Sequence, residues 1–115
     1  MEKNADMRIR GMLGFAMRAG KLTIGTDAVC QELRKKPVKV KLVLLSESAS
    51  AGTKKKITTK CEFYNAPLRE IAIIAEELGD LLGKTYAPAV VAVCDEGFAK
   101  EIAAACDSRE SETLK

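Results

Sequence analysis

The sequence contains no histidine and no tryptophan, and its cysteines stand singly, without a Cys-x-x-Cys pair, at Cys30, Cys61, Cys94 and Cys106. Structural zinc sites need clustered cysteine or histidine ligands, so we expect no metal site. Histidine is the most frequent general base, and no two carboxylates are spaced for acid and base roles. We therefore expect no catalytic residue and no cofactor, and we interpret the cysteines as small buried apolar side chains in a reducing compartment.

Long apolar runs are also missing. None approaches the roughly 20 residues that a membrane span requires, and residues 1–6 are too polar for a secretory signal. With 115 residues, of which 47% are hydrophobic and 30% charged, the composition is that of one soluble globular domain. We predict a cytoplasmic protein without membrane contact, monomeric when free. Its single domain should span residues 1–106, followed by a polar, frayed tail over 107–115.

Charge is distributed unevenly along the chain. Residues 1–60 contain 14 Lys and Arg against 5 Asp and Glu, a balance of +9, whereas residues 61–115 contain 5 against 11, a balance of −6. A basic half in so short a chain is typical of a protein with one face for a polyanion, most often a nucleic acid. The alternative is that opposite charges intermix on the folded surface.

The segment 19–29, A-G-K-L-T-I-G-T-D-A-V, indicates where an anion could bind. A helical pattern stops at Gly20, one short extended piece follows, and Gly25 opens a second helix whose first amides are free. Free amides at the positive end of a helix dipole attract phosphate. The alternative is that both glycines only mark ordinary turns.

Hydrophobic periodicity predicts helices that alternate with strands. Ile9, Met12, Leu13, Ala16 and Met17 mark the first helix. Further helices are expected from Thr26 to the break at Lys36-Pro37, around 57–64, over 74–82 and over 98–106; strands are expected at 22–24, 40–45, 68–71 and 89–94. This order predicts an α/β sandwich with helices on both faces of a sheet.

In such folds, ligands usually bind at loops beyond the strand ends. We expect the loops 20–27, 46–53 and 83–88 to gather at one end of the sheet, with Lys21, Lys54 and Lys84 on or beside them. The run Lys54-Lys55-Lys56 lies at the start of a predicted helix, where positive charges interact unfavourably with the helix dipole. Binding of an anionic partner would explain why three lysines occur there. An ordinary solvated face is the alternative.

A nucleotide-binding enzyme is a less favoured alternative, which would use the loop 20–25. Gly20-Lys21 is similar to the end of a phosphate-binding P-loop. However, Phe15 stands at the first glycine position, Leu22 replaces the Ser or Thr, and a helix precedes the loop where a strand belongs.

Five motifs in order resemble the ribosomal L7Ae and L30e family, especially its small bacterial members of the YlxQ type. They are A-G-K-L-x-x-G; S-E-S-A-S followed by T-K-K-K-I; C-E-F-Y-N-A-P; E-L-G-D-L-L-G-K; and V-V-A-V-C-D-E-G-F-A-K. The resemblance covers about residues 7–102. It implies a three-layer α/β/α sandwich around a four-stranded mixed sheet and binding of structured RNA, typically kink-turns or ribosomal RNA.

The resemblance places RNA at the helix start after Gly25 and at the loops 46–50 and 83–89. The candidate RNA-binding residues, including lysines beside these loops, are Gly20, Lys21, Gly25, Thr26, Asp27, Ala28, Gln31, Glu47, Ser48, Ala49, Ser50, Lys54, Lys55, Lys84, Ala87 and Pro88.

The helix start departs from the family pattern. Family members that recognise kink-turns carry Gly-x-Asn-Glu-x-x-Lys, whereas this chain has Asp27, Ala28 and Gln31 at the three polar positions. Kink-turn selectivity is therefore expected to weaken, and RNA binding to be mainly electrostatic. Asp27 could alternatively serve only as a helix-start acid. The chain could also be a structural ribosomal component with little affinity outside the particle.

Overall fold

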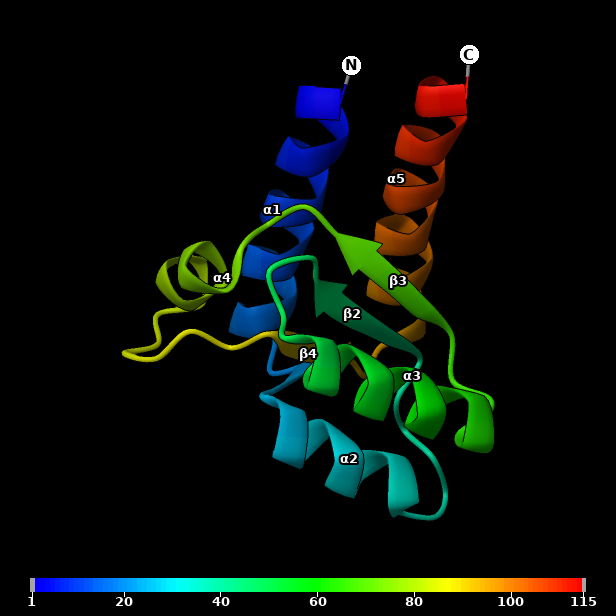
Figure 1. Ribbon diagram of the computed structural model, residues 1–115. Coiled ribbons are helices and arrows are strands. Elements are labelled where there is room, and N and C mark those ends of the chain that lie inside the picture. Colours follow the sequence, from blue (N-terminus) through cyan, green and yellow to red (C-terminus); the bar gives the residue numbers. More distant parts are fainter. Residues whose placement is uncertain (1, 115) are drawn as a thin grey trace.

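The computed structural model describes residues 2–114 of the chain, and the side chains of residues 6–107. Helices and strands alternate in the order expected from the sequence (Figure 1). They are α1 (Glu2–Arg18), β1 (Leu22–Ile24), α2 (Thr26–Arg34), β2 (Leu42–Ser46), α3 (Ala51–Tyr64), β3 (Leu68–Ile71), α4 (Ala75–Leu81), β4 (Val90–Val93) and α5 (Glu96–Leu114).

The strands form one mixed sheet in the order β1-β4-β2-β3. β4 runs antiparallel to both of its neighbours, β1 and β2, while β2 runs parallel to β3. As a result, β1, β2 and β3 all end at the edge of the sheet where β4 begins. We call this the loop edge, and it comprises residues 25–27, 46–50, 72–74 and 83–89.

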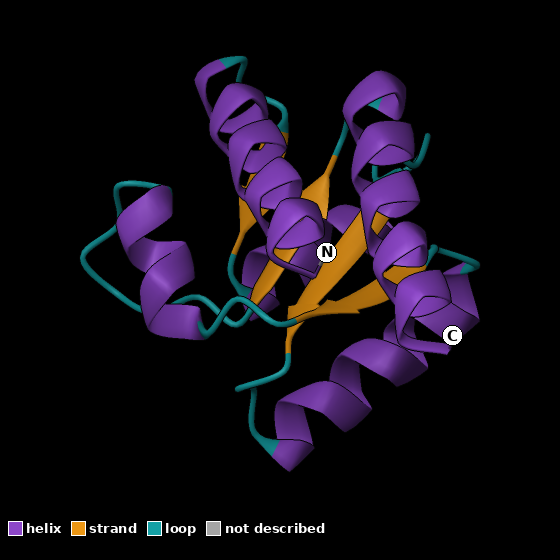
Figure 2. Ribbon diagram, turned by 90° about the horizontal axis from the view of Figure 1, so that it is seen from above, coloured by secondary structure: helices purple, strands orange, loops and turns teal. Residues whose placement is uncertain are grey.

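Helices cover both faces of the sheet (Figures 1 and 2). The face covered by α1, α4 and α5 buries Ile9, Leu13, Leu42, Leu44, Ile71, Ile73, Leu78, Leu82, Val91, Val93, Ala99, Ile102, Ala105 and Cys106. The face covered by α2 and α3 buries Val29, Cys30, Leu33, Val40, Val43, Leu45, Ile57, Cys61, Val90 and Ala92. Because successive strand residues point to opposite faces, each central strand contributes to both clusters. The expected three-layer sandwich is confirmed.

The segments 40–45 and 89–94, both expected to be strands, contain the central strands β2 and β4, and every residue in these two strands is buried. β2 begins at Leu42, two residues later than expected. Val40 is nevertheless buried against α2 and α3. An apolar pattern predicts that a residue is buried more directly than it predicts that the residue lies in a strand. Ile74, expected on the helix face, precedes α4 and is 41% exposed.

Helix α5 continues to Leu114, through most of the segment for which we expected a frayed tail. Fraying of that segment in solution stays a prediction. Met1 and Lys115 lie outside the described residues. None of the described helices combines the length and apolarity needed to cross a bilayer. Within the described part of the chain, no three His, Cys, Asp or Glu side chains gather as a metal site would require.

Candidate nucleic-acid interface

Helix α2 begins at the loop edge without a side-chain cap. Gly25 has φ 104° and ψ 147°, a backbone conformation that L residues rarely adopt, and its N–H donates to the Val90 carbonyl (2.9 Å) at the start of β4. No described side chain accepts a hydrogen bond at this cap position. The first amides of α2 are therefore available to an anion, as the sequence suggested, and they stand beside the half-buried Thr26 and Ala28 and the exposed Asp27.

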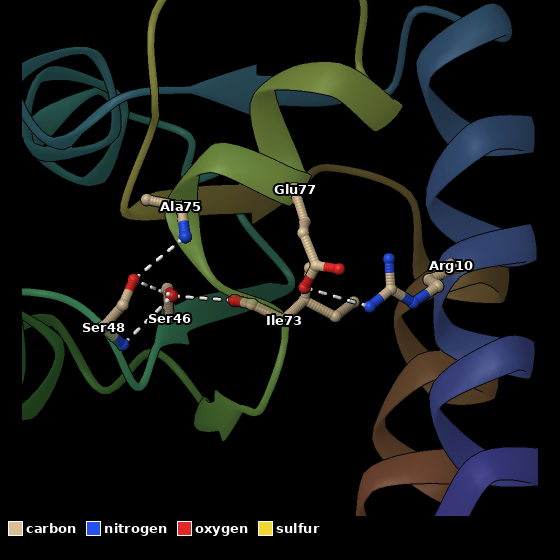
Figure 3. Close-up of polar contacts among 6 residues, drawn as sticks. All are labelled: Arg10, Ser46, Ser48, Ile73, Ala75 and Glu77. Atoms are coloured by element: carbon tan, nitrogen blue, oxygen red, sulfur yellow. Dashed lines mark hydrogen bonds and ion pairs between the residues drawn. The ribbon is translucent and has the colours of Figure 1, made fainter.

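The loop 46–50 is fastened to α4 by a serine network (Figure 3). The Ser46 hydroxyl is fully buried and donates to the Ile73 carbonyl at 2.7 Å. Its oxygen accepts from the Ser48 amide at 3.2 Å and lies 2.9 Å from the Ser48 hydroxyl. Because the single Ser46 hydroxyl hydrogen is engaged with Ile73, Ser48 donates in that pair. The Ser48 oxygen in turn accepts from the Ala75 amide (2.9 Å), the first of α4.

Two of the predicted RNA-contact residues, Ser48 and Ser50, have structural roles within the protein. Ser48 supplies a cap for α4, and Ser50 caps α3 by accepting from the Thr53 amide at 3.2 Å. Their side chains fix the shape of the loop, while Glu47 is exposed and Ala49 half-buried beside them. RNA contact by this loop stays a prediction.

The segment 83–88 returns from α4 to β4 by packing against Gly79. A Cβ on Gly79 would overlap the Tyr86 carbonyl and touch the Pro88 ring, so only glycine permits this approach. Pro88 is buried as a result, unlike the exposed Ala87 before it, and RNA contact at Pro88 stays a prediction. Lys84 is half-buried and Ala87 exposed in the same segment.

The three consecutive lysines face different surroundings. Lys54 lies 3.8 Å from the Glu70 carboxylate, and Lys56 lies 3.5 Å from that of Asp27. Lys55 is exposed and forms no ion pair with another described side chain. The two pairs are largely exposed, and such pairs contribute about 1 kcal/mol or less, so RNA phosphates could displace them at small cost.

Gly20 and Lys21 lie at the opposite edge of the sheet. The Lys21 carbonyl accepts from the Cys94 amide (2.8 Å), just beyond the end of β4, whereas Gly25 bonds to Val90 at the start of that strand. The expectation that these two residues join the other candidates is wrong, because β1 separates them from Gly25. RNA contact at the opposite edge stays a prediction.

Sequence reasoning missed three residues of this region. Tyr86 is 53% exposed on the segment 83–89, where an aromatic ring could stack on an unpaired base. Ser46 and Gly79 are buried and shape the two loops. An aromatic residue inside a Gly-Lys-Thr-Tyr-Ala-Pro loop was a usable signal for Tyr86. Nothing in the local pattern indicated which serine is buried.

The cysteines do not offer a nucleophile at the loop edge. Cys30, Cys61 and Cys106 are buried, as expected, and Cys94 is half-buried, with its sulfur 3.7 Å from the Thr23 hydroxyl. Burial, with a smaller effect of the neighbouring Cys30, raises the pKa of Cys61 to about 11. The Cys61 thiol therefore stays protonated at neutral pH.

Comparison with known proteins identifies the family. The model of the ribosomal protein L7Ae/L30e/S12e/Gadd45 family matches residues 7–103. The chain belongs to this family. Among members of the L7Ae/L30e family, the RNA-binding protein YlxQ of Bacillus subtilis (strain 168) is 44% identical to this chain over 96 residues. The matched residues cover 84% of this chain and 92% of that protein. This chain is 33% identical over 90 residues to large ribosomal subunit protein eL30 of Sulfolobus acidocaldarius, covering 78% and 85%.

Solved structures agree with this family assignment. A protein of unknown function from Bacillus halodurans superposes with a TM-score of 0.78 and 34% identity, over 87% of this chain and 97% of that one. The Giardia lamblia 15.5 kD RNA-binding protein superposes with a TM-score of 0.74 over 94% and 89%. Its identity is 13%, so this second likeness shows the L7Ae/L30e-type fold alone. The resemblance to small bacterial YlxQ-type members is confirmed.

Proposed function

We propose that this L7Ae/L30e-family protein binds structured RNA at its loop edge and catalyses no reaction. The uncapped start of α2 carries the proposal, because free helix amides receive phosphate oxygens without sequence preference. The names of the relatives from Bacillus subtilis and Enterococcus faecium, both RNA-binding proteins YlxQ, support RNA as the partner. The similarity to eL30 favours ribosomal RNA among structured RNAs.

Each part of the loop edge has a distinct task in this proposal. The amides of Thr26 and Asp27 hold a phosphate, and Lys55 and Lys84 supply positive charge on either side. Tyr86 stacks on an unpaired base, which gives a preference for bent or looped RNA over a regular duplex. The serine network keeps the loop 46–50 and α4 at a fixed separation around this site.

A gel-shift comparison of a kink-turn RNA, a matched straight duplex and transfer RNA tests the proposal. The parent chain should bind at least one of the structured RNAs, with log affinity falling linearly against log salt by about 0.7 to 0.9 per phosphate contact. Tyr86→Ala should reduce the preference for the looped RNA, and Lys84→Ala should weaken all three complexes. Lys100→Ala, an exposed charge on α5, serves as the control. Absence of RNA binding, or tight binding of a mononucleotide alone, would contradict the proposal.

Selectivity for kink-turns is tested by restoring the polar residues typical of the family. The triple change Asp27→Asn, Ala28→Glu and Gln31→Lys adds base-reading groups and one cation to the first two turns of α2. Each good base contact contributes about 1 to 3 kcal/mol of discrimination, so preference for the kink-turn over the duplex should rise about tenfold or more. An unchanged ratio would show that this helix does not face the RNA bases.

A further inference from the structure

Helices α2 and α3 form a groove that starts at the loop edge. Both helices begin there and run side by side across one face of the sheet (Figure 1). The groove between them has a volume of about 290 Å³ and is lined by Asp27, Cys30, Gln31, Arg34, Lys56 and Lys60. Asp27 and Gln31 belong to the candidate interface, so the groove is continuous with it.

Positive charge dominates this groove. Arg34 comes from α2, while Lys56 and Lys60 come from α3, and the only carboxylate in the lining belongs to Asp27. Asp27 lies 3.5 Å from Lys56, but neither Arg34 nor Lys60 forms an ion pair with another described side chain. Three cations against one carboxylate leave a balance of +2 at neutral pH. Two cations without partners on facing helices indicate an anionic ligand.

The shape of the groove limits that ligand. At 1.5 Å per residue, the seven steps from Asp27 to Arg34 span roughly 10 Å, enough for a short stretch of nucleic-acid backbone. Its volume is at the lower limit for pockets that enclose a small molecule, and its lining residues include no aromatic ring on which a base could stack. Charge without a stacking surface favours phosphate over base.

We propose that the α2–α3 groove binds the phosphodiester backbone of the RNA strand that leaves the loop edge. This inference rests on the proposed function and extends its site away from the loops. Lys56 and Lys60 contact phosphates from one side, and Arg34, with its planar fork of donors, contacts them from the other. The groove also gives a reason for the third lysine of the Lys54-Lys55-Lys56 run, which faces α2.

The test compares two double variants that each remove two positive charges. Arg34→Gln with Lys60→Gln empties the groove of its unpartnered cations. The control, Lys41→Gln with Lys100→Gln, removes exposed cations at the opposite edge of the sheet and on α5. Affinity for whichever of the three RNAs the parent binds most tightly is measured from 50 to 400 mM salt. Thermal unfolding of each variant verifies that the fold is retained.

The groove variant should bind about tenfold more weakly than the control at low salt, with a log–log salt slope smaller by about 1.5. Exchanging the two cations, Arg34→Lys with Lys60→Arg, should recover most of the loss, because phosphate recognition here depends mainly on charge. Equal affinity and slope in the groove variant and the control would overturn the groove while leaving the loop edge intact. A parent chain that binds none of the RNAs would overturn the proposed function and this inference with it.

Discussion

Replacing Ser46 with alanine should destabilise the domain more than its small size suggests. The side chain is fully buried, and its oxygen is the centre of three hydrogen bonds, to the Ile73 carbonyl and to the hydroxyl and amide of Ser48. Ser46→Ala removes this oxygen. The Ile73 carbonyl and the Ser48 amide both lose a partner.

The expected cost follows from those two groups. Leaving a buried donor or acceptor unsatisfied costs about 1 to 3 kcal/mol each, and solvation of the exposed Ser48 reduces its share. We therefore expect the free energy of unfolding to fall by about 2 to 4 kcal/mol. With a urea dependence of about 2 kcal/mol per M, the midpoint of unfolding should fall by about 1 to 2 M.

Urea denaturation monitored by circular dichroism measures this change. Ser48→Ala is the matched control: it removes the acceptor for the Ala75 amide at a more exposed position and should cost only about 1 kcal/mol, as for other helix caps. The double variant should be less destabilised than the sum of the singles, because the two hydroxyls share one hydrogen bond. A Ser46→Ala loss below 1 kcal/mol with additive behaviour would refute the network as the fastening of the loop.

Three further outcomes are expected. Gly79→Ala should lower stability by about 1 to 3 kcal/mol and weaken RNA binding, because the new methyl group displaces the Tyr86 backbone; Gly11→Ala, which meets open space on α1, should stabilise by about 0.5 to 1 kcal/mol in the same urea and gel-shift assays. Burial raises the pKa of Cys61 from 9.0 to about 11, so the unfolded chain releases this proton first. The stability gained by keeping this thiol neutral is fully present below pH 9, and about 2 kcal/mol of it should be lost by pH 11. The free energy of unfolding of Cys61→Ala should lack this loss between pH 8 and 11. If the parent chain and Cys61→Ala show the same pH dependence, the Cys61 thiol has its ordinary pKa in the folded protein. Lys21→Ala should affect RNA binding less than Lys84→Ala, since only Lys84 lies at the loop edge; a larger loss for Lys21→Ala would move the interface to the opposite edge.

The sequence predicted the layers of the fold well because its signals are local. Continuous apolar runs identified the central strands, and the glycine at Gly25 with its positive φ marked the start of α2 correctly. Which candidate residues lie together in space was harder to predict, because that depends on the direction in which each strand runs. Lys21 and Gly25 are near in sequence, yet a three-residue strand carries them to opposite edges.

Side-chain tasks at the site were harder still to predict. An exposed polar loop of serines is typical of a ligand contact, but Ser46 is buried and Ser48 caps a helix 27 residues away. Both roles are set by packing between segments that no short motif relates. The burial of Pro88 against Gly79 has the same origin, since it requires two backbones to meet closely.

The antiparallel placement of β4 has a consequence for how the protein is made. Leu22 pairs with Val93, which is 71 residues later in the chain, and Gly25 is held by Val90. In the sheet, β4 lies between β1 and β2. During synthesis, β1 therefore lacks the strand with which it pairs, and β2 lacks one of its two neighbours, until β4 has emerged. Pairings so distant in sequence form slowly and leave apolar strand edges open meanwhile. The segments of the loop edge therefore assemble together and late. A ribosome-bound fragment that stops before residue 90 would hold every cation of the α2–α3 groove and every residue of the loop edge, yet lack the strand that brings those segments together.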